Sequence, residues 1–278
     1  MPDKLIIDTD IGTDVDDAIA LTYAIRSGID IPLITTVHGN TTIRARIARK
    51  LVSLLGKDIP VVAGAEKPLK QPYIYWTGRE GDGFLESSDA DDIPTNSIDA
   101  LVECIDTNRN KVSIACIAPL TNIATTFVHY PELTKYVNHL YLMGNALHCG
   151  SSFHLNYRAH NFKVDPEAAD IVMGLGIPTT LVTTEICKRN FLTPDDIGQL
   201  AATSDTALTY IAQAAVSWMT WINYPVTYLY DPLVVHHHID RTITTQQQYG
   251  SVSITTDVHN SFKEHVMATL RLRGGNTT

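Results

Sequence analysis

The sequence is poor in cysteine, has no long apolar run and shows no cluster of basic residues. Its cysteines are widely scattered, with no Cys-x-x-Cys pair and no histidine at zinc-ligand spacing beside them, which favours reduced, mostly buried thiols over disulfides or a zinc site; they are Cys104, Cys116, Cys149 and Cys187. No apolar stretch reaches the ~18 residues that a membrane-spanning helix needs. The formal net charge of -9 argues against a nucleic-acid partner, because binding to a phosphate backbone usually requires clustered Lys and Arg. We therefore expect partners that are neither nucleic acids nor membranes.

The N-terminus also lacks the pattern of an export signal. Residues 1–7 (MPDKLII) run directly into an aspartate-rich turn, without a basic segment, an apolar segment and a cleavage site in succession. With 44% hydrophobic and 18% charged residues, the chain has the composition of a globular protein with a sizeable core. We expect a soluble, cytoplasmic enzyme.

What the sequence does contain is an alternation of strand-like and helix-like segments. Near-continuous apolar runs, typical of parallel strands buried on both faces, occupy 4–8, 31–37, 59–63, 111–117, 138–143 and 178–183. Amphipathic stretches separate them at 17–27, 41–56, 98–107 and 166–174. This alternation predicts an α/β fold: one domain over 1–278, with a doubly wound, mostly parallel sheet flanked by helices.

The last third of the chain departs from this alternation. A helical pattern follows the Thr-Pro-Asp-Asp sequence at 193–196 and continues to about residue 222. Thr and Gln alternate with apolar residues from 242 to 254 around Tyr249-Gly250, which predicts a small C-terminal hairpin. Residues 68–95 have little periodicity and are the best candidate for a loop over a functional site.

The strongest functional signal is a cluster of aspartates at the end of the first strand. The segment IIDTDIGTDVDDAIAL (6–21) carries five carboxylates within ten residues: Asp8, Asp10, Asp14, Asp16 and Asp17. Helix capping and the helix dipole account for the last three individually, but not for Asp8 and Asp10 at the end of an apolar strand. The carboxyl end of a strand is where open α/β sheets bind ligands, and a hard cation such as Ca²⁺ would relieve the repulsion between the carboxylates. The pattern therefore favours a Ca²⁺ site.

The same segment resembles the fingerprint of the nucleoside hydrolases, D-x-D-P-G-x-D-D-A. This copy has Ile11 in place of the proline and two extra residues in the turn. Further segments match that family in order: ITTVHGN (34–40), APLTNIA (118–124), LMGNA (142–146), NFKVDPEAA (161–169) and YDPL (230–233). Together they span most of the chain, so the resemblance implies calcium-dependent hydrolysis of the N-glycosidic bond of a ribonucleoside, by a homo-oligomer (dimer or tetramer).

The resemblance also implies roles for individual residues. The metal ligands would be Asp10, Asp17, the backbone carbonyl of Thr121, and Asp231, and Asp10 would also activate the attacking water. The substrate contacts would be Asp16 and Asn40 at the ribose hydroxyls, Asn161 near the 5′ end of the sugar, and Met143, Asn145 and His160 beside them. The role of Asp10 is chemically consistent, because a carboxylate opposite the leaving group deprotonates water in inverting glycosidases.

The chain departs from the family at the leaving group and at the 5′ end of the sugar. Tyr230 replaces a histidine before the last metal aspartate, and a phenol with an ordinary pKa near 10 is a weak acid. The GREGDGF segment (78–84) lacks a histidine that the family often has, and Ala159 replaces a carboxylate that contacts the 5′-hydroxyl. Asn156, Arg158 or His160 are the candidates to replace that contact. Candidate base-pocket aromatics are Trp76, Trp218, Trp221, Tyr224 and Tyr228, although such residues commonly belong to the core.

Two other functions compete with this interpretation. A haloacid-dehalogenase-like, magnesium-dependent phosphatase also begins with a strand and D-x-D-x-[GT], which Asp8 and Asp10 match, but the acidic pair expected downstream is not evident. A nucleoside-binding protein that has lost its acid catalyst would bind ribosides without releasing free base. The consecutive His236, His237 and His238 are a poor metal site, because successive helical residues point ~100° apart.

Overall fold

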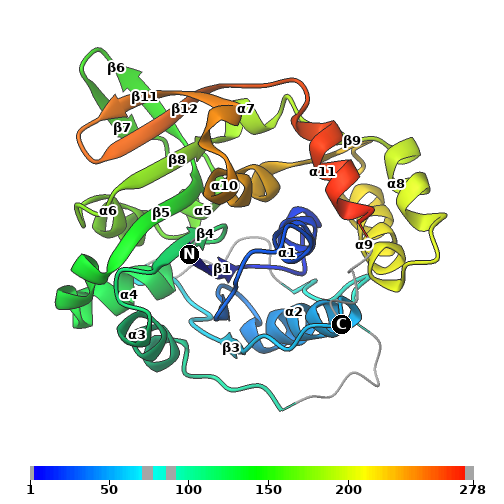
Figure 1. Ribbon diagram of the computed structural model, residues 1–278, viewed down its shortest axis with the longest axis horizontal. Coiled ribbons are helices and arrows are strands. Elements are labelled where there is room, and N and C mark those ends of the chain that lie inside the picture. Colours follow the sequence, from blue (N-terminus) through cyan, green and yellow to red (C-terminus); the bar gives the residue numbers. More distant parts are fainter. Residues whose placement is uncertain (1–2, 71–77, 86–91, 273–278) are drawn as a thin grey trace.

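A mostly parallel eight-stranded sheet forms the centre of the protein, whose computed structural model describes residues 3–70, 78–85 and 92–272 (Figure 1). The strands lie in the order β11-β12-β8-β5-β4-β1-β2-β3, and only the edge pair β11 and β12 is antiparallel. Their bounds are β1 Lys4–Thr9, β2 Ile34–Thr36, β3 Val61–Ala63, β4 Val112–Cys116, β5 Val137–Gly144, β8 Thr179–Thr183, β11 Thr244–Tyr249 and β12 Val252–Val258. The predicted α/β fold with a mostly parallel sheet is confirmed.

Helices cover both faces of this sheet. The main ones are α1 Asp16–Arg26, α2 Thr41–Leu54, α3 Ser97–Thr107, α4 Thr121–His129, α6 Pro166–Met173, α8 Pro194–Ala201, α9 Thr206–Ile222, α10 Tyr230–Ile239 and α11 Phe262–Leu270. Shorter elements are α5 His160–Val164, α7 Thr184–Cys187, the 3-10 turns Pro131–Tyr136 and Arg241–Ile243, and the two-stranded pairs β6 Ala146–Cys149 with β7 Ser152–Leu155 and β9 Phe191–Leu192 with β10 Thr227–Tyr228. Within the described ranges, no helix has the length and apolarity needed to cross a bilayer.

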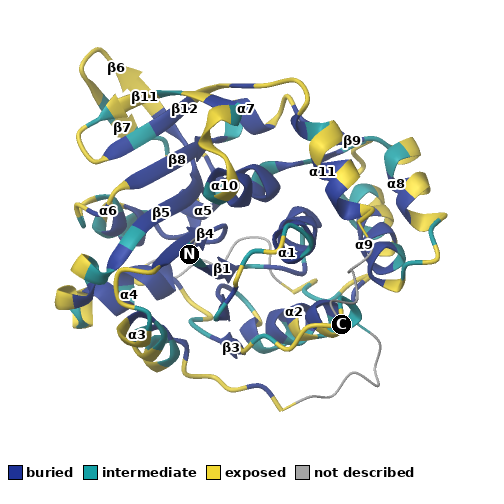
Figure 2. Ribbon diagram, in the orientation of Figure 1, coloured by how far each residue is buried: buried dark blue, intermediate teal, exposed yellow. Residues whose placement is uncertain are grey.

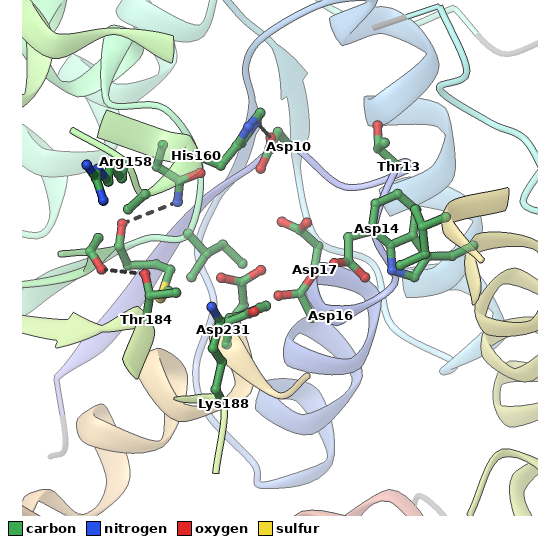
Figure 3. Close-up of a pocket in the computed structure, with 18 of the residues that line it drawn as sticks. Asp10, Thr13, Asp14, Asp16, Asp17, Arg158, His160, Thr184, Lys188 and Asp231 are labelled. Carbon is green, nitrogen blue, oxygen red and sulfur yellow. Dashed lines mark hydrogen bonds and ion pairs between the residues drawn. The ribbon is translucent and has the colours of Figure 1, made fainter. Parts of the chain in front are cut away.

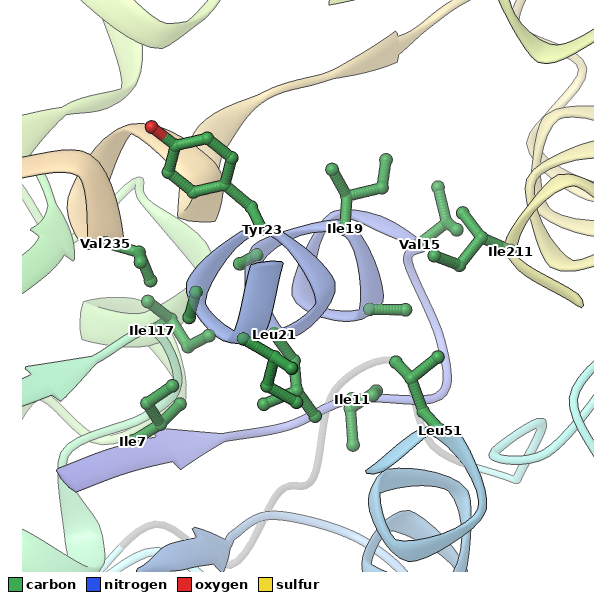
Figure 4. Close-up of a cluster of buried hydrophobic side chains, with 14 of the residues drawn as sticks. Ile7, Ile11, Val15, Ile19, Leu21, Tyr23, Leu51, Ile117, Ile211 and Val235 are labelled. Atoms are coloured by element: carbon green, nitrogen blue, oxygen red, sulfur yellow. The ribbon is translucent and has the colours of Figure 1, made fainter. Parts of the chain in front are cut away.

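Two hydrophobic layers lie on opposite faces of the sheet, because successive strand side chains point to opposite sides. In β1, Leu5 and Ile7 join the layer that contains α1, α2, α9, α10 and α11, whereas Ile6 joins the layer that contains α3, α4 and α6. All three side chains are fully buried, and Figure 2 shows the central strands mostly buried. Figure 4 shows α1 enclosed by side chains from other elements, among them Leu51 of α2 and Val235 of α10. The turn before α1 therefore leads directly into a helix that is packed against other elements.

The turn between β1 and α1 needs a glycine at position 12. Gly12 has a φ of +113°, a region that L side chains rarely adopt, and an added Cβ would lie 2.4 Å from Cδ1 of Ile47. Its carbonyl accepts a hydrogen bond from the main-chain N–H of Gly81, at 3.1 Å. The described part of the predicted loop 68–95 thus contacts the aspartate turn, while residues 71–77 and 86–91, and with them Trp76, lie outside the described residues.

The predicted C-terminal hairpin is present as β11 and β12, and it belongs to the main sheet. Residues Val252–Ile254 of β12 pair in parallel with Thr179–Leu181 of β8. Helix α11, which the sequence patterns did not predict, follows the hairpin and returns to pack against α1. The C-terminal segment therefore completes the same fold.

Candidate active site

A cavity of about 360 Å³ opens at the carboxyl ends of the central strands (Figure 3). This volume lies within the range of about 300–1,000 Å³ that small-molecule sites occupy. Its walls come from the β1–α1 turn, the ends of β4 and β5, the segment before α5, and helices α7, α9 and α10. The lining residues are Asp10, Thr13, Asp14, Asp16, Asp17, Arg44, Ile117, Met143, Gly144, Arg158, Ala159, His160, Asn161, Thr184, Lys188, Trp218, Ile222, Tyr230 and Asp231.

Three carboxylates meet at the floor of the cavity. One oxygen from each of Asp16, Asp17 and Asp231 lies within 4.8 Å of the others, and each residue is 4% exposed. Asp16 and Asp17 form the first turn of α1, and Asp231 lies in the first turn of α10, so two helix N-termini bring the acids together. Burial, followed by the charges of neighbouring aspartates, raises the pKa of each of these carboxyl groups well above its ordinary value. The arrangement is unfavourable for three anions unless a cation joins them.

Asp10 lies beside this group, but its neighbours favour the ionised form of its carboxyl group. Its Oδ2 is 3.6 Å from Nε2 of His160, and its side chain is 13% exposed. Burial by itself raises the pKa of Asp10, but the interaction with His160 and the positive charge of Arg44 outweigh it and lower that pKa. Asp10 is therefore the carboxylate of the cavity that stays ionised most readily.

Arg44 of α2 anchors the main chain of the aspartate turn, a role that sequence reasoning missed. Its side chain is 1% exposed and donates to three main-chain carbonyl groups: those of His38 at 2.6 Å, Ile11 at 3.0 Å, and Asp10. The guanidinium group also lies 3.9 Å from Oε1 of Glu80. A fixed guanidinium that binds backbone oxygens orients the chain and adds positive charge behind Asp10.

Asp14 is a further carboxylate in the cavity. It belongs to the turn with two extra residues, and its Oδ1 accepts hydrogen bonds from the main-chain N–H of Val15 at 2.6 Å and the hydroxyl of Thr227 at 3.4 Å. Burial raises the pKa of Asp14 to about 7. The extra length of the turn is the sequence signal for this position.

Tyr230 and Trp218 line the side of the cavity formed by α10 and α9. Burial, followed by the charges of Asp16 and Asp14, raises the pKa of the Tyr230 phenol, which therefore stays neutral and able to donate a hydrogen bond. The Tyr228 ring packs at 5.3 Å from the Tyr230 ring, but Tyr228, Tyr224 and Trp221 do not line the cavity. Of the described candidate aromatics, Trp218 and Tyr230 are thus the ones in position to contact a base.

The opposite wall carries main-chain and amide groups. Nδ2 of Asn161 donates to the carbonyl oxygen of Met143 at 3.3 Å, and the hydroxyl of Thr184 donates to the carbonyl oxygen of Gly144 at 3.2 Å (Figure 3). These bonds fix the end of β5 against α5 and α7. The predicted substrate contacts Asn161, Met143 and His160 all line the cavity, as do Asp10, Asp16, Asp17, Tyr230 and Asp231.

Three predicted site residues are not among those that line the cavity, and the side chain of each has another partner. Thr121 begins α4, and its hydroxyl donates to Oδ2 of Asp165 at 2.7 Å; Ile117 is the residue of the β4–α4 connection that reaches the cavity. Asn40 caps α2, with Oδ1 accepting from the main-chain N–H of Ile43 at 3.0 Å. Asn145 donates to Oε1 of Glu185 at 2.8 Å. The roles predicted for these three residues stay predictions.

Asp8 also lies outside the cavity, which removes the nucleophile that the phosphatase alternative requires. It is completely buried, and its Oδ1 accepts from the Thr35 hydroxyl at 2.6 Å and from Nδ2 of Asn122 at 2.8 Å. Asn122 also donates to the carbonyl oxygen of Thr36 at 3.1 Å. Asp8 therefore ties the ends of β1, β2 and the start of α4 together.

The three consecutive histidines of α10 diverge, as expected. Nδ1 of His236 lies 2.6 Å from the hydroxyl of Tyr23, whereas Nε2 of His238 lies 2.9 Å from the carbonyl oxygen of Asp3. His237 contacts Thr244 at 3.3 Å. They stabilise the packing of α10 and form no common site.

The sequence of this chain also matches known proteins. The sequence model of the family described as "Inosine-uridine preferring nucleoside hydrolase" matches residues 5–274. The non-specific ribonucleoside hydrolase RihC of Salmonella paratyphi B is 32% identical over 214 residues, which cover 73% of this chain and 67% of that protein.

Solved structures have the same fold. A purine-preferring ribonucleoside hydrolase from Gardnerella vaginalis superposes with a TM-score of 0.82 at 22% identity, covering 96% of this chain and 98% of the other. An inosine-uridine preferring nucleoside hydrolase from Bacillus anthracis gives a TM-score of 0.77 at 20% identity, covering 98% and 99%. At these identities the structures support the fold of the chain rather than its substrate.

Proposed function

On the premise that the chain belongs to the inosine-uridine preferring nucleoside hydrolase family and is an N-ribohydrolase, we propose that it cleaves ribonucleosides with the help of Ca²⁺ bound at the aspartate floor. The observation that carries the proposal is the convergence of Asp10, Asp16, Asp17 and Asp231 on one cavity. The RihC relative is named as a non-specific ribonucleoside hydrolase, which favours broad acceptance of bases here too.

The donor set fits a hard divalent cation. The close group of Asp16, Asp17 and Asp231 offers carboxylate oxygens. Burial and repulsion between neighbouring aspartates raise the pKa values of all three. Oxygen ligands without Cys or His match Ca²⁺ better than Zn²⁺. We propose Asp10, Asp17 and Asp231 as ligands, joined by the main-chain carbonyl of Ile117 in place of Thr121. When bound, Ca²⁺ would neutralise these charges and help to orient water and the ribose hydroxyls.

Asp10 is the proposed general base. Because its pKa is lowered, it is ionised at neutral pH and can accept a proton from a water that attacks C1′ of the ribose. Arg44 holds the main chain of Asp10, and His160 faces its carboxylate, so the base is fixed from two sides. We propose that Asp16, in the first turn of α1, accepts hydrogen bonds from the ribose hydroxyls.

The leaving base would lie against Trp218 and Tyr230. The bond between C1′ and the base nitrogen breaks with its electron pair moving to the base, and a hydrogen bond to the base stabilises that charge. Tyr230 can donate such a bond because its phenol remains protonated. A neutral phenol is a weaker acid than an imidazolium, so bases that leave easily should be preferred.

A panel of ribonucleosides, assayed separately for free base and for ribose, tests the proposal. We expect stoichiometric release of both, abolished by Asp10→Asn with the fold retained. Tight binding of ribosides without turnover would favour the nucleoside-binding protein instead. Cytoplasmic location and assembly as a dimer or tetramer stay predictions, and sedimentation velocity tests the latter.

A further inference from the structure

Asp14 is the carboxylate of the cavity to which the proposed function gives no role. It lines the cavity and is half-buried. Its hydrogen-bond partners are uncharged groups, the main-chain N–H of Val15 and the hydroxyl of Thr227. Within residues 3–70, 78–85 and 92–272, no ion pair joins Asp14 to an arginine, a lysine or a histidine. The Asp14 carboxylate therefore has no cationic side chain as a partner.

Asp14 belongs to the wall of the cavity that the leaving base would contact. The hydroxyl that donates to Asp14 comes from β10, directly before α10 and its Tyr230. After burial and Asp16, the charge of Asp14 is the next largest cause that raises the pKa of the Tyr230 phenol, and such an effect weakens with distance. Thr13, the residue before Asp14, lines a second, smaller hollow together with Trp218. One carboxylate and two aromatic rings thus share this wall.

The cationic side chains of the cavity lie away from this wall. Arg44 is buried and donates to main-chain carbonyl groups of the aspartate turn. In Figure 3, Arg158 lies on the opposite side of the aspartates from Asp14, and Lys188 extends toward the cavity from below. A carboxylate beside aromatic faces is a combination that attracts a flat cation, through charge and through cation–π contact. The wall is therefore suited to a ring that carries a positive charge.

A base with a fixed positive charge also removes the need for a strong acid. When the C1′–N bond of an ordinary nucleoside breaks, the base takes the electron pair and needs a hydrogen-bond or proton donor. The phenol of Tyr230 is a weak donor of a proton because its pKa is raised. When the base is a pyridinium or an N7-alkylated purine, the same electron pair cancels the positive charge, and the base leaves as a neutral molecule.

We propose that ribosides whose base carries a fixed positive charge are the preferred substrates, and that Asp14 binds the charged ring between the sugar site and the wall formed by Trp218 and Tyr230. The inference rests on the proposed ribohydrolase function. The water oxygen bonds to C1′ and passes its proton to Asp10, while the electron pair of the C1′–N bond moves to the ring nitrogen. The products are ribose, a neutral base and one proton. A positive ring beside Asp14 also favours the ionised form of its carboxyl group.

The kinetic test uses nicotinamide riboside, inosine and nitrophenyl riboside with the calcium-saturated enzyme. We expect a higher kcat/KM for nicotinamide riboside than for inosine. Asp14→Asn should raise the KM for nicotinamide riboside by about tenfold or more without lowering kcat, because the positive charge lies on the ring in the bound substrate and leaves it in the transition state. The KM for nitrophenyl riboside should change far less, since this substrate is activated but uncharged. An equal rise in both KM values would assign Asp14 to the shape of the cavity and overturn the proposal.

Asp257→Asn is the matched control. Asp257 also accepts a hydrogen bond from the main-chain N–H of the residue that follows it, at 2.8 Å, but its side chain is 60% exposed and does not line the cavity. This variant removes the same charge from the protein as Asp14→Asn does. Its KM for nicotinamide riboside should therefore equal that of the parent protein.

Calorimetric titration with 1-methylnicotinamide and with nicotinamide tests the charge preference without turnover, because the two ligands share a ring and differ in its charge. We expect the cation to bind more tightly, and this preference to be lost in Asp14→Asn but kept in Asp257→Asn. If inosine is cleaved but Asp14→Asn leaves the KM values and the titrations unaltered, the inference is wrong and the proposed function stands. If no riboside is cleaved, the proposed function is wrong, and the titrations alone decide whether Asp14 binds a cationic ring.

Discussion

Nε2 of His160 lies 3.6 Å from Oδ2 of Asp10, so the imidazole faces the carboxylate that we propose as the base. Substitution of His160 by Gln should lower kcat by about tenfold, because the carboxylate loses a partner that both orients it and favours its ionised form. Steady-state kinetics with a natural nucleoside measures the loss. A change confined to KM would instead place His160 in substrate binding.

Asp10→Asn should abolish nearly all hydrolysis, by at least about 10²-fold, since it removes the proposed base and a metal ligand together. Asp8→Asn should be much milder, because Asp8 is buried outside the cavity and an asparagine Oδ1 can accept the same two hydrogen bonds. Circular dichroism confirms folding of both variants. A covalent phosphorylated intermediate on Asp8 would revive the phosphatase alternative.

Removal of the metal should reduce both activity and thermal stability. A ligand that binds only the folded state stabilises it by about 2.7 kcal/mol at 100 times its Kd, so added Ca²⁺ should raise Tm in a concentration-dependent way after treatment with a chelator. Asp231→Asn should weaken this dependence, since its carboxylate belongs to the close group. Full activity and an unchanged melting curve in excess chelator would remove the metal from the mechanism.

Tyr230→Phe tests the hydrogen bond to the leaving base. The variant should slow inosine more than nitrophenyl riboside, whose acidic leaving group needs no such help, and a difference of about tenfold is expected for one lost hydrogen bond. Tyr228→Phe is the control, because the Tyr228 ring packs against Tyr230 but does not line the cavity. Equal slowing of both substrates would assign Tyr230 to positioning.

The buried histidines of α10 should make the protein less stable at acidic pH. Burial lowers the pKa of His237 to about 3 and that of His236 to about 4, so the unfolded chain binds protons more readily than the folded one as pH falls below the ordinary pKa of about 6.5. Each such histidine therefore costs at most about 1.4 kcal/mol of stability per pH unit between pH 6.5 and its folded pKa.

Urea unfolding at pH 7 and at pH 5 measures this effect. His237→Gln should reduce the difference in unfolding free energy between the two pH values, whatever it does to stability at pH 7. His129→Gln, at the exposed end of α4, should leave that difference as it is in the parent protein. Equal pH dependence in all three proteins would show that His237 does not contribute to acid sensitivity.

The central sheet and the aspartate turn could be predicted because their signals are local. An apolar run such as 111–117 indicates a strand buried on both faces wherever it lies, and the spacing of Asp10, Asp16 and Asp17 belongs to a single turn and its following helix. Asp231, more than 200 residues away, was assigned by its YDPL motif, and the structure brings it to the same floor through the first turn of α10.

Other features depended on how distant segments meet, which no local pattern encodes. The hydroxyl of Thr121 donates to Asp165, and Ile117 is the residue of the β4–α4 connection that lines the cavity. The position at which α4 begins decides which residue of this connection faces the cavity. Arg44 of α2 donates to the main chain of the aspartate turn, and Trp218 of α9 lines the cavity, although neither residue lies in a recognised motif. These side chains reach the cavity only through the packing of α2 and α9 in the fold, since a side chain's electrostatic partners are set by distance in space rather than by separation along the chain.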